Sequence, residues 1–227
     1  MRTAELEMFV KISKFFYFKY LLDCFLLMSH SWHVSSNLLN SIEEAILDYR
    51  ISHQKLTGVY HTSYELMLGA NPVQSSDYPI IRSVISRCAL QRDDTIIDIG
   101  CGMGRFLGYL SLRGFSGNLI GIEIDRTYAD FCSYMFAKKK NISIICDNAI
   151  DIASTFPDDA VLYLYNPFSA KVLDMFLSEA RGKKIIYTNS VNEAAFSKHP
   201  EWKLHQKWQS SLNDGTPVPA MEFINQR

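Results

Sequence analysis

The sequence predicts a doubly wound α/β fold, in which a mostly parallel sheet carries helices on both faces. From Asp94 onward, short β-branched runs alternate with longer mixed segments of helical spacing. The runs are apolar at successive positions, which is typical of strands buried on both faces. A glycine-rich turn follows the first run. Right-handed crossovers place helices on both sides of such a sheet, so the alternation indicates a two-sided α/β domain.

Five parallel strands are expected, and they span Thr95 to Ile99, Leu119 to Glu123, Ile142 to Cys146, Val161 to Tyr165 and Lys184 to Thr188. Helices fit between them near residues 104–113, 127–139 and 169–181. The tail differs, because "WKLHQKWQSSL" and "AMEFINQ" are joined by the turn-forming "NDGTPVP". The tail is therefore predicted to form an antiparallel pair of strands that completes a seven-stranded sheet.

The N-terminal third is expected to be helical and to form a separate unit. Residues 1–70 carry apolar positions at helical spacing, and the punctuated stretch "GANPVQSSDYP" follows as a loop. Helical spacing then resumes in "IIRSVISRCAL". We therefore expect an N-terminal helical extension or lid over residues 1–70 and a ligand-binding domain over residues 71–227.

The charge balance excludes a general electrostatic partner. The chain of 227 residues has 23 basic and 24 acidic side chains and a pI near 6.6. Such a balance gives no global attraction to nucleic acid or to anionic lipid. We expect no general nucleic-acid binding, and the oligomeric state stays open.

Cysteine and histidine usage indicates a cytoplasmic protein without a metal. The five cysteines are odd in number and widely spaced, and they include no C-x-x-C pair. This pattern argues against a disulfide framework and against a zinc site, so reduced thiols are expected. The six histidines also lack ligand spacing with cysteine or acid.

The segment "KISKFFYFKYLLDCFLLMSHSW" is the most apolar part of the N-terminus. Its uninterrupted apolar runs are far shorter than the roughly 18 residues of a spanning helix, and Lys19 and Asp23 interrupt it. A buried amphipathic helix is expected, and peripheral membrane contact is the alternative. Met28 is a second possible start of translation, so the choice between Met1 and Met28 stays open. The role of residues 1–56 stays open as well.

The glycine turn does not match the common phosphate-binding motifs. Gly100, Gly102 and Gly104 follow the first strand and let the backbone approach a ligand closely. A dinucleotide fingerprint would require a glycine at position 105 or 107, where the chain has Arg105 and Leu107. A P-loop would require Gly-Lys followed by Ser or Thr, which is also absent.

Acidic residues accompany the glycine turn at one rim of the expected sheet. Asp98 precedes the turn, Glu123 ends the second strand and Asp147 follows the third. A carboxylate after the second strand suits the two hydroxyls of a ribose, and the next acid can accept a hydrogen bond from an adenine amine. Three acids without a pyrophosphate motif suit an adenosine ligand that carries positive charge.

The motifs "DIGCGMGRF", "IGIEID", "CDNAID" and "YLYNPF" resemble, in order and spacing, those of the class I S-adenosylmethionine-dependent methyltransferases. The resemblance covers roughly residues 94–227. It implies a Rossmann-like methyltransferase fold with an antiparallel last strand, and S-adenosyl-L-methionine as cofactor. In that family the loop matched by Asp98, Gly100, Gly102 and Gly104 holds the methionine part of the cofactor.

The resemblance also implies roles for the acids on the later strands. Glu123 falls where the family binds the ribose, and Asp147 falls where it contacts adenine, with Asn148 beside it. Arg105 is open between a contact with the cofactor carboxylate and an ordinary surface position.

The turn after the fourth strand, Asn166-Pro167-Phe168, falls where the resemblance places methyl transfer. Amino-group methyltransferases have Asn or Asp, two prolines and an aromatic residue there, whereas this chain has one proline fewer. The turn slightly favours N-methylation over O-methylation. A hydroxyl acceptor would need a base, for which the candidates are Asp151, Tyr78 and His61, with no placement preferred. Tyr60, Tyr64 or Tyr78 could line the acceptor pocket from a lid.

The expected activity is methyl transfer to a small molecule, a glycan or a protein side chain. Two alternatives remain from other classes. One is a nucleotide-linked oxidoreductase with a degenerate fingerprint, and the other is a non-catalytic binding protein with the same fold.

Overall fold

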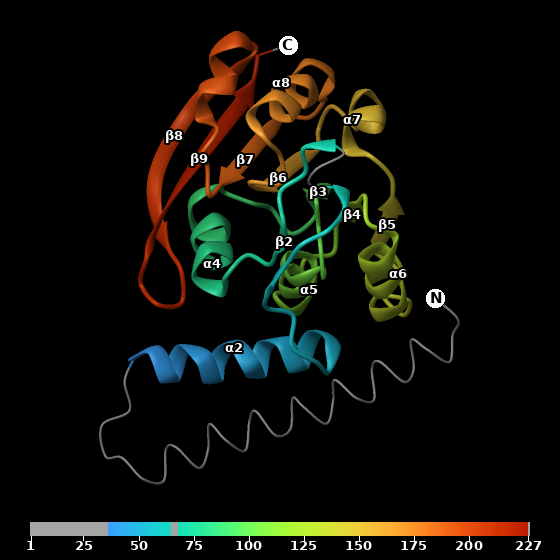
Figure 1. Ribbon diagram of the computed structural model, residues 1–227, viewed down its shortest axis with the longest axis vertical. Helices are drawn as coiled ribbons and strands as arrows, with labels where there is room; N and C mark the ends of the chain where they lie inside the picture. The colour runs from blue at the N-terminus through green and yellow to red at the C-terminus, as the bar shows by residue number, and fades with distance from the viewer. Residues whose placement is uncertain (1–35, 65–67, 227) are drawn as a thin grey trace, which may run out of the picture.

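Seven strands form one sheet in the order β5-β4-β3-β6-β7-β9-β8 (Figure 1). The computed structural model describes residues 36–64 and 68–226. The strands are β3 (Ile96–Ile99), β4 (Leu119–Glu123), β5 (Ile142–Cys146), β6 (Val161–Tyr165), β7 (Lys184–Thr188), β8 (Trp202–Ser211) and β9 (Pro217–Asn225). The five parallel strands expected from the sequence are confirmed, four of them at the expected ends and β3 one residue shorter.

The strand directions confirm the predicted fold class. Strands β5, β4, β3, β6 and β7 run parallel to their neighbours, whereas β9 is antiparallel to β7. Strand β8 is antiparallel to β9 and therefore runs with the other strands. The sheet is thus mostly parallel, with only its last strand in chain order reversed.

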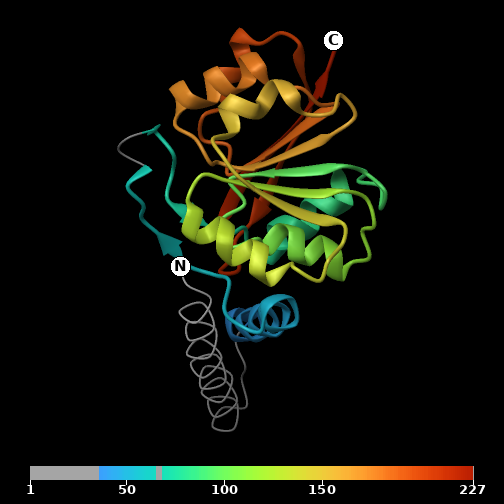
Figure 2. The same cartoon turned by 90° about the vertical axis from the view of Figure 1, so that its right-hand side faces the viewer.

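Helices cover both faces of the sheet (Figure 2). One layer contains α4 (Tyr78–Arg87), α5 (Arg105–Leu112) and α6 (Arg126–Met135). The opposite layer contains α7 (Ala149–Ile152), the short η1 (Ala153–Thr155), α8 (Ala170–Glu179) and η2 (Glu193–Lys198). These helices confirm the segments expected between the strands and the one expected after "SSDYP", although α6 ends four residues early.

A separate hydrophobic core lies on each face of the sheet. On the α5 side, the rings of Phe106 and Tyr163 stack with centroids 3.8 Å apart. On the α8 side, Phe196 and Phe223 stack with centroids 3.7 Å apart. Each buried ring or branched side chain contributes roughly 1.5–3 kcal/mol by leaving water, so the two cores hold the sheet between its layers.

The strand order reverses between β3 and β6. From β3 the chain proceeds through β4 and β5 on one side, and β6 then returns to the other side of β3. In open α/β sheets, ligands bind beyond the carboxyl ends of the strands at such a reversal. The glycine turn follows β3 and the Asn-Pro-Phe turn follows β6, so the fold brings both motifs to this point.

The described N-terminal residues include the helix α2 and a small two-stranded ribbon. Helix α2 (Ser36–Ser52) confirms the helical prediction for this stretch and lies beside α5 in Figure 1. A left-handed backbone at His53, with φ of 60°, ends the helix. Strands β1 (Val59–Tyr60) and β2 (Val73–Gln74) then pair antiparallel, so a continuous helix to residue 70 is wrong.

The apolar segment and the alternative start at Met28 lie outside the described residues. Within residues 36–64 and 68–226, we find no helix that is both long and apolar enough to cross a membrane.

Helix α2 is fixed to the core by a buried arginine. The Arg105 side chain is 1% exposed, and its guanidinium lies 2.7 Å from Oε1 of Glu44 and 2.8 Å from Oδ2 of Asp48. It also lies over the Tyr78 ring, 4.8 Å from the centroid. Both interpretations of Arg105 from the sequence are therefore wrong, because its partners on α2 could not be located from the sequence.

The carboxylate of Asp48 collects three hydrogen bonds in this cluster. Its Oδ1 accepts from the Tyr78 hydroxyl at 2.6 Å, and its Oδ2 accepts from the Leu56 amide at 2.8 Å and from Arg105. Asp48 itself is fully buried. Removal of Arg105 would leave the Asp48 carboxylate buried without a cationic partner, which costs several kcal/mol.

We predict that Arg105→Met lowers the free energy of unfolding by about 3–5 kcal/mol, because Asp48 then remains charged and buried. The matched control is Arg82→Met, which removes a second α2 contact at the surface. Arg82 lies 2.7 Å from Glu43, with the two side chains 39% and 50% exposed. Its loss should cost about 0–1 kcal/mol. Urea unfolding of both variants measures the difference, and equal costs would contradict the assignment.

Candidate functional site

A cavity of about 420 Å³ lies at the reversal point of the sheet, within the range typical of ligand pockets. Among the residues singled out from the sequence, its walls include Gly100, Glu123, Asp147, Asn148, Pro167 and Phe168. These residues come from the ends of four different strands. The fold therefore brings the glycine turn, two of the three rim acids and the Asn-Pro-Phe turn to one cavity.

Two glycines of the turn lie in close contact with other segments, Gly100 with Pro167 and Gly102 with Val73. Gly100 and Gly102 have φ values of 72° and 52°, which L side chains rarely adopt. An added Cβ at Gly100 would lie 2.9 Å from Cβ of Pro167, and one at Gly102 would lie 2.8 Å from a methyl of Val73. Both positions thus require glycine for conformation and for space.

Glu123 ties the glycine turn to the second strand. Its Oε2 accepts a hydrogen bond of 2.8 Å from the Gly102 amide, and its Oε1 accepts one of 2.9 Å from the Asp125 amide. The side chain is 3% exposed. Burial raises the pKa of Glu123, while the two backbone hydrogen bonds act against that rise. Each oxygen keeps a further lone pair for a ligand hydroxyl.

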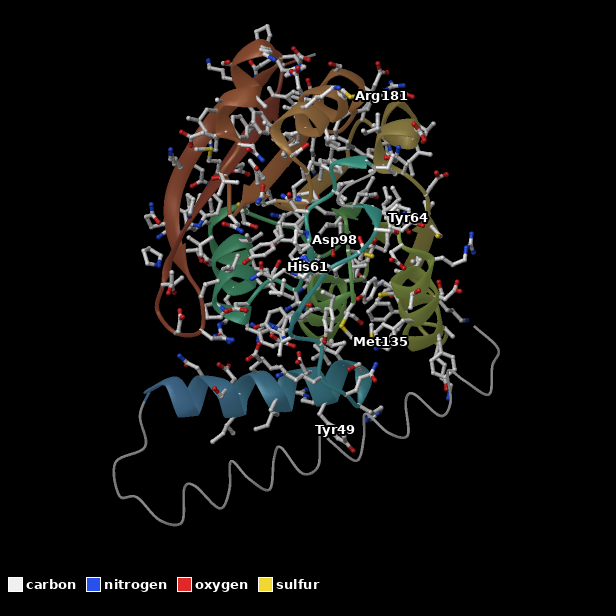
Figure 3. All side chains as sticks on the ribbon, in the orientation of Figure 1. Tyr49, His61, Tyr64, Asp98, Met135 and Arg181 are labelled. Carbon is white, nitrogen blue, oxygen red and sulfur yellow. The ribbon has the colours of Figure 1, made fainter. Side chains whose placement is uncertain are left out.

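Asp98 lies beneath the turn near the middle of the molecule in Figure 3. It is 4% exposed, and its carboxylate has no hydrogen-bond partner among the described residues. Burial, and secondarily the charge of Glu123, raise its pKa well above the usual range. Buried charges in proteins are normally paired, so this carboxylate fits a cationic ligand group.

The third acid and its neighbour lie at the open rim. Asp147 is exposed, and its Oδ1 accepts a hydrogen bond of 2.8 Å from the Asn148 amide. Asn148 caps α7 through a hydrogen bond of 3.3 Å from the Ile150 amide. Both residues therefore combine a local turn role with a place in the cavity wall.

The Asn-Pro-Phe turn is held in an unusual backbone conformation. Asn166 has φ of 46°, and its Oδ1 accepts a hydrogen bond of 2.8 Å from the Tyr187 hydroxyl. Phe168 is buried, with its ring centroid 5.3 Å from that of Phe176. A non-glycine residue with positive φ costs energy and is held only where its surroundings determine it.

Asn71 joins the segment before β2 to this turn. Its side-chain amide donates to the Asn166 carbonyl at 2.7 Å, and its backbone amide donates to the Pro167 carbonyl at 2.9 Å. Ala70 forms an antiparallel bridge with Phe168. The cavity wall includes Thr62 and residues 68–74. The lid in this part of the chain stays a prediction from the sequence. The sequence gave no signal for Asn71, because the contact joins residues 95 positions apart.

The side chains proposed as bases or as lid tyrosines lie elsewhere. Tyr78 is 1% exposed and belongs to the Arg105 cluster. Asp151, His61, Tyr60 and Tyr64 line neither this cavity nor the second one beside it. The role of these residues at an acceptor pocket stays a prediction.

The described part of the chain contains no group of three or more His, Cys, Asp or Glu side chains that could hold a metal ion. Within it, Cys88, Cys101, Cys132 and Cys146 are free thiols.

The comparisons with known proteins agree with this geometry. Residues 92–170, which include the glycine turn and the Asn-Pro-Phe turn, match a family profile described as "Putative methyltransferase". The chain has the fold of the class I methyltransferases. A curated protein described as a putative methyltransferase of Mycobacterium tuberculosis is 35% identical over 57 residues, or 25% of this chain. The matched stretch spans 34% of that relative's length.

Solved structures show the same methyltransferase fold at low identity. An S-adenosylmethionine-dependent methyltransferase from Aquifex aeolicus is 14% identical, with a TM-score of 0.51, and the match covers 72% of this chain and 94% of that one. TrmK from M. capricolum, in complex with S-adenosyl-homocysteine, is 12% identical with a TM-score of 0.50. That match covers 65% of this chain and 68% of that one.

We predict that Asp98→Asn stabilises the protein without ligand at neutral pH. Because burial raises the folded-state pKa of Asp98, the folded protein holds this proton more tightly than the unfolded chain does. The charge therefore costs stability once the pH exceeds the unfolded pKa near 3.8. A tenfold difference in proton affinity between the two states corresponds to about 1.4 kcal/mol, so Tm should rise by about 3 °C or more at neutral pH.

The gain in Tm should shrink as the pH falls towards about 4, where Asp98 is protonated in the folded state and begins to be protonated in the unfolded chain as well. Thermal unfolding between about pH 4 and pH 8 measures this trend. The control Asp159→Asn removes an exposed carboxylate and should leave Tm nearly unchanged. A lower Tm for Asp98→Asn at neutral pH would contradict the role given to burial.

Proposed function

We propose that this protein is an S-adenosylmethionine-dependent methyltransferase. The observation that carries the proposal is the buried carboxylate of Asp98, which has no hydrogen-bond partner among the described residues and lies beneath a glycine turn at the sheet's reversal point. The family profile over residues 92–170 and the fold it shares with methyltransferases support it. The S-adenosyl-homocysteine complex of TrmK supports the choice of cofactor.

The residues present fit that cofactor part by part. We assign the α-ammonium to the region of Asp98, because this acid has no other cation beside it in the described structure. We assign the ribose hydroxyls to Glu123 and the adenine to Asp147 and Asn148. The turn of Gly100, Gly102 and Gly104 supports the methionine part, because a bare backbone permits close approach.

Methyl transfer would take place beside Asn166, Pro167 and Phe168. When bound, S-adenosylmethionine supplies a methyl group on a sulfonium. Transfer forms a bond from an acceptor lone pair to the methyl carbon, the sulfur–carbon bond breaks, and the sulfur keeps that electron pair. The chain's contribution is to align the acceptor and exclude water, which can lower the barrier by several kcal/mol.

The acceptor is a small molecule, a glycan or a protein side chain, with nitrogen slightly favoured over oxygen. The Asn166 Oδ1 and the Pro167 carbonyl already accept from Tyr187 and Asn71. Each oxygen keeps one lone pair that an acceptor N–H can use.

We further propose that residues 1–70 act as an N-terminal extension and lid, and that residues 71–227 form the cofactor-binding domain. Thr62 and Leu68 in the cavity wall support the lid role. The free thiols favour a cytoplasmic location.

We predict that S-adenosyl-homocysteine binds with a micromolar Kd and that Glu123→Ala or Asp98→Ala weakens binding at least tenfold. Each variant removes a carboxylate assigned to a polar group of the ligand, and isothermal titration calorimetry measures the change. The exposed Asp159→Ala serves as the control and should keep the wild-type Kd. Thermal stabilisation by NAD(P) with none by S-adenosyl-homocysteine would instead favour the oxidoreductase alternative.

A further inference from the structure

A second cavity of about 480 Å³ lies next to the first. The two cavities share Asn71, Pro72, Gln74, Tyr165 and Ser169 in their walls. The second cavity lies between the lid segment and the turns that follow β6 and β7. A molecule in it would therefore lie beside the Asn-Pro-Phe turn and in reach of the first cavity.

The walls of the second cavity contain no charged side chain among the described residues. Five side chains are carboxamides, namely Asn71, Gln74, Asn166, Asn189 and Asn192. Two carry hydroxyls, Tyr165 and Ser169, and four are apolar, Val59, Pro72, Ala170 and Val191. The first cavity, by contrast, contains the charged side chains of Glu123, Asp147 and Lys171. The two cavities thus differ in the charge that they can accept.

Two of these asparagines occupy equivalent places on neighbouring strands. Asn166 follows β6 and Asn189 follows β7, and both have left-handed backbones, with φ of 46° and 50°. The Tyr187 hydroxyl donates to Asn166 Oδ1 and accepts from the Asn192 amide at 3.3 Å. Strained non-glycine residues persist where the surroundings fix them, often at ligand sites.

The hydrogen bonds within the protein leave donors and acceptors of both kinds free in this wall. The side-chain NH₂ groups of Asn71 and Asn192 donate to the Phe168 carbonyl, at 3.2 and 2.9 Å. Their Oδ1 atoms have no partner among the described residues and so remain available as acceptors. Asn166 uses Oδ1 for Tyr187 and keeps its NH₂ group as a donor.

Tyr165 adds a hydroxyl where the two cavities meet. The hydroxyl has no hydrogen-bond partner in the described part of the chain. Burial, reinforced by the negative charge of Asp77, raises the pKa of Tyr165 to about 12. The phenol therefore stays protonated at neutral pH and can both donate and accept a hydrogen bond.

We propose that the second cavity holds the methyl acceptor and that this acceptor presents an uncharged, hydroxyl-rich surface, as a sugar does. The assignment rests on the proposed methyltransferase function and selects the glycan among its acceptor classes. It concerns the part of the acceptor that this wall holds and not the atom that receives the methyl group. A hydroxyl is both donor and acceptor, which matches a wall of carboxamides and a phenol. A charged group would lose hydration there without gaining a partner of opposite charge.

The test compares sugars that differ only in charge. Saturation-transfer NMR is measured on the full chain with excess S-adenosyl-homocysteine, using the methyl glycosides of glucose, galactose and mannose as neutral probes. Methyl glucosaminide supplies the positive counterpart and methyl glucuronide the negative one. We expect at least one neutral glycoside to give a signal at least threefold stronger than both charged counterparts.

Tyr165→Phe and Asn189→Ala should each reduce the neutral signal at least threefold. Asn189 lines only the second cavity, so Asn189→Ala should also leave the Kd of S-adenosyl-homocysteine within twofold. Tyr134→Phe is the matched control, because Tyr134 is 46% exposed on α6 and lines neither cavity. Its signal should equal that of the wild type. The Phe variant retains the ring, so a lost signal reports the hydroxyl rather than the packing.

Two results separate the failure of this assignment from that of the proposed function. If S-adenosyl-homocysteine does not bind the wild-type chain in calorimetry, the proposed function fails and this assignment fails with it. If S-adenosyl-homocysteine binds but no neutral glycoside gives a signal, the assignment alone is overturned. The same holds if a charged counterpart gives an equal signal or if both variants behave as the wild type.

Discussion

The close approach of the glycine turn to the Asn-Pro-Phe turn is the constraint on which the site depends. Gly100 leaves no room for a Cβ beside Pro167, and Gly102 leaves none beside Val73 of the lid ribbon. This contact lies at the point where the strand order reverses. It also orients the Gly102 amide towards Glu123, so one backbone arrangement fixes the turn, the second strand's acid and the cavity wall together.

Two buried charges near this point have opposite surroundings. Arg105 begins α5, directly after the glycine turn, and is paired with Glu44 and Asp48, so it links α2 to the core. Asp98, on the strand before the turn, has no partner in the described structure. The first arrangement pairs its charges without a ligand, although Arg105 Nε itself has no hydrogen-bond partner among the described residues. The second is incomplete, and this is typical of a binding site that trades stability for affinity.

Two neighbouring cavities divide the chemistry that the fold can support. The first contains two carboxylates and the Lys171 ammonium, so it suits a compound that carries charge, whereas the second contains carboxamides and hydroxyls and suits a neutral one. Asn71 belongs to both walls and donates a hydrogen bond to the turn after β6. The segment before β2 and the two cavities therefore meet at one side chain.

The sequence alone determined the five parallel strands, the reversed last strand and the carboxylates at the strand ends, because strand periodicity and glycine turns are local signals. It also indicated a lid before the core. Tertiary structure alone decided the partners of Arg105, the burial of Tyr78 and the absence of Tyr60, Tyr64 and His61 from both cavities. Tertiary structure also decided the contact of Asn71 with the Asn-Pro-Phe turn and the position of Tyr165 between the two cavities. Each depends on residues distant in the chain, and local patterns carry no information about which side chains meet when the layers pack.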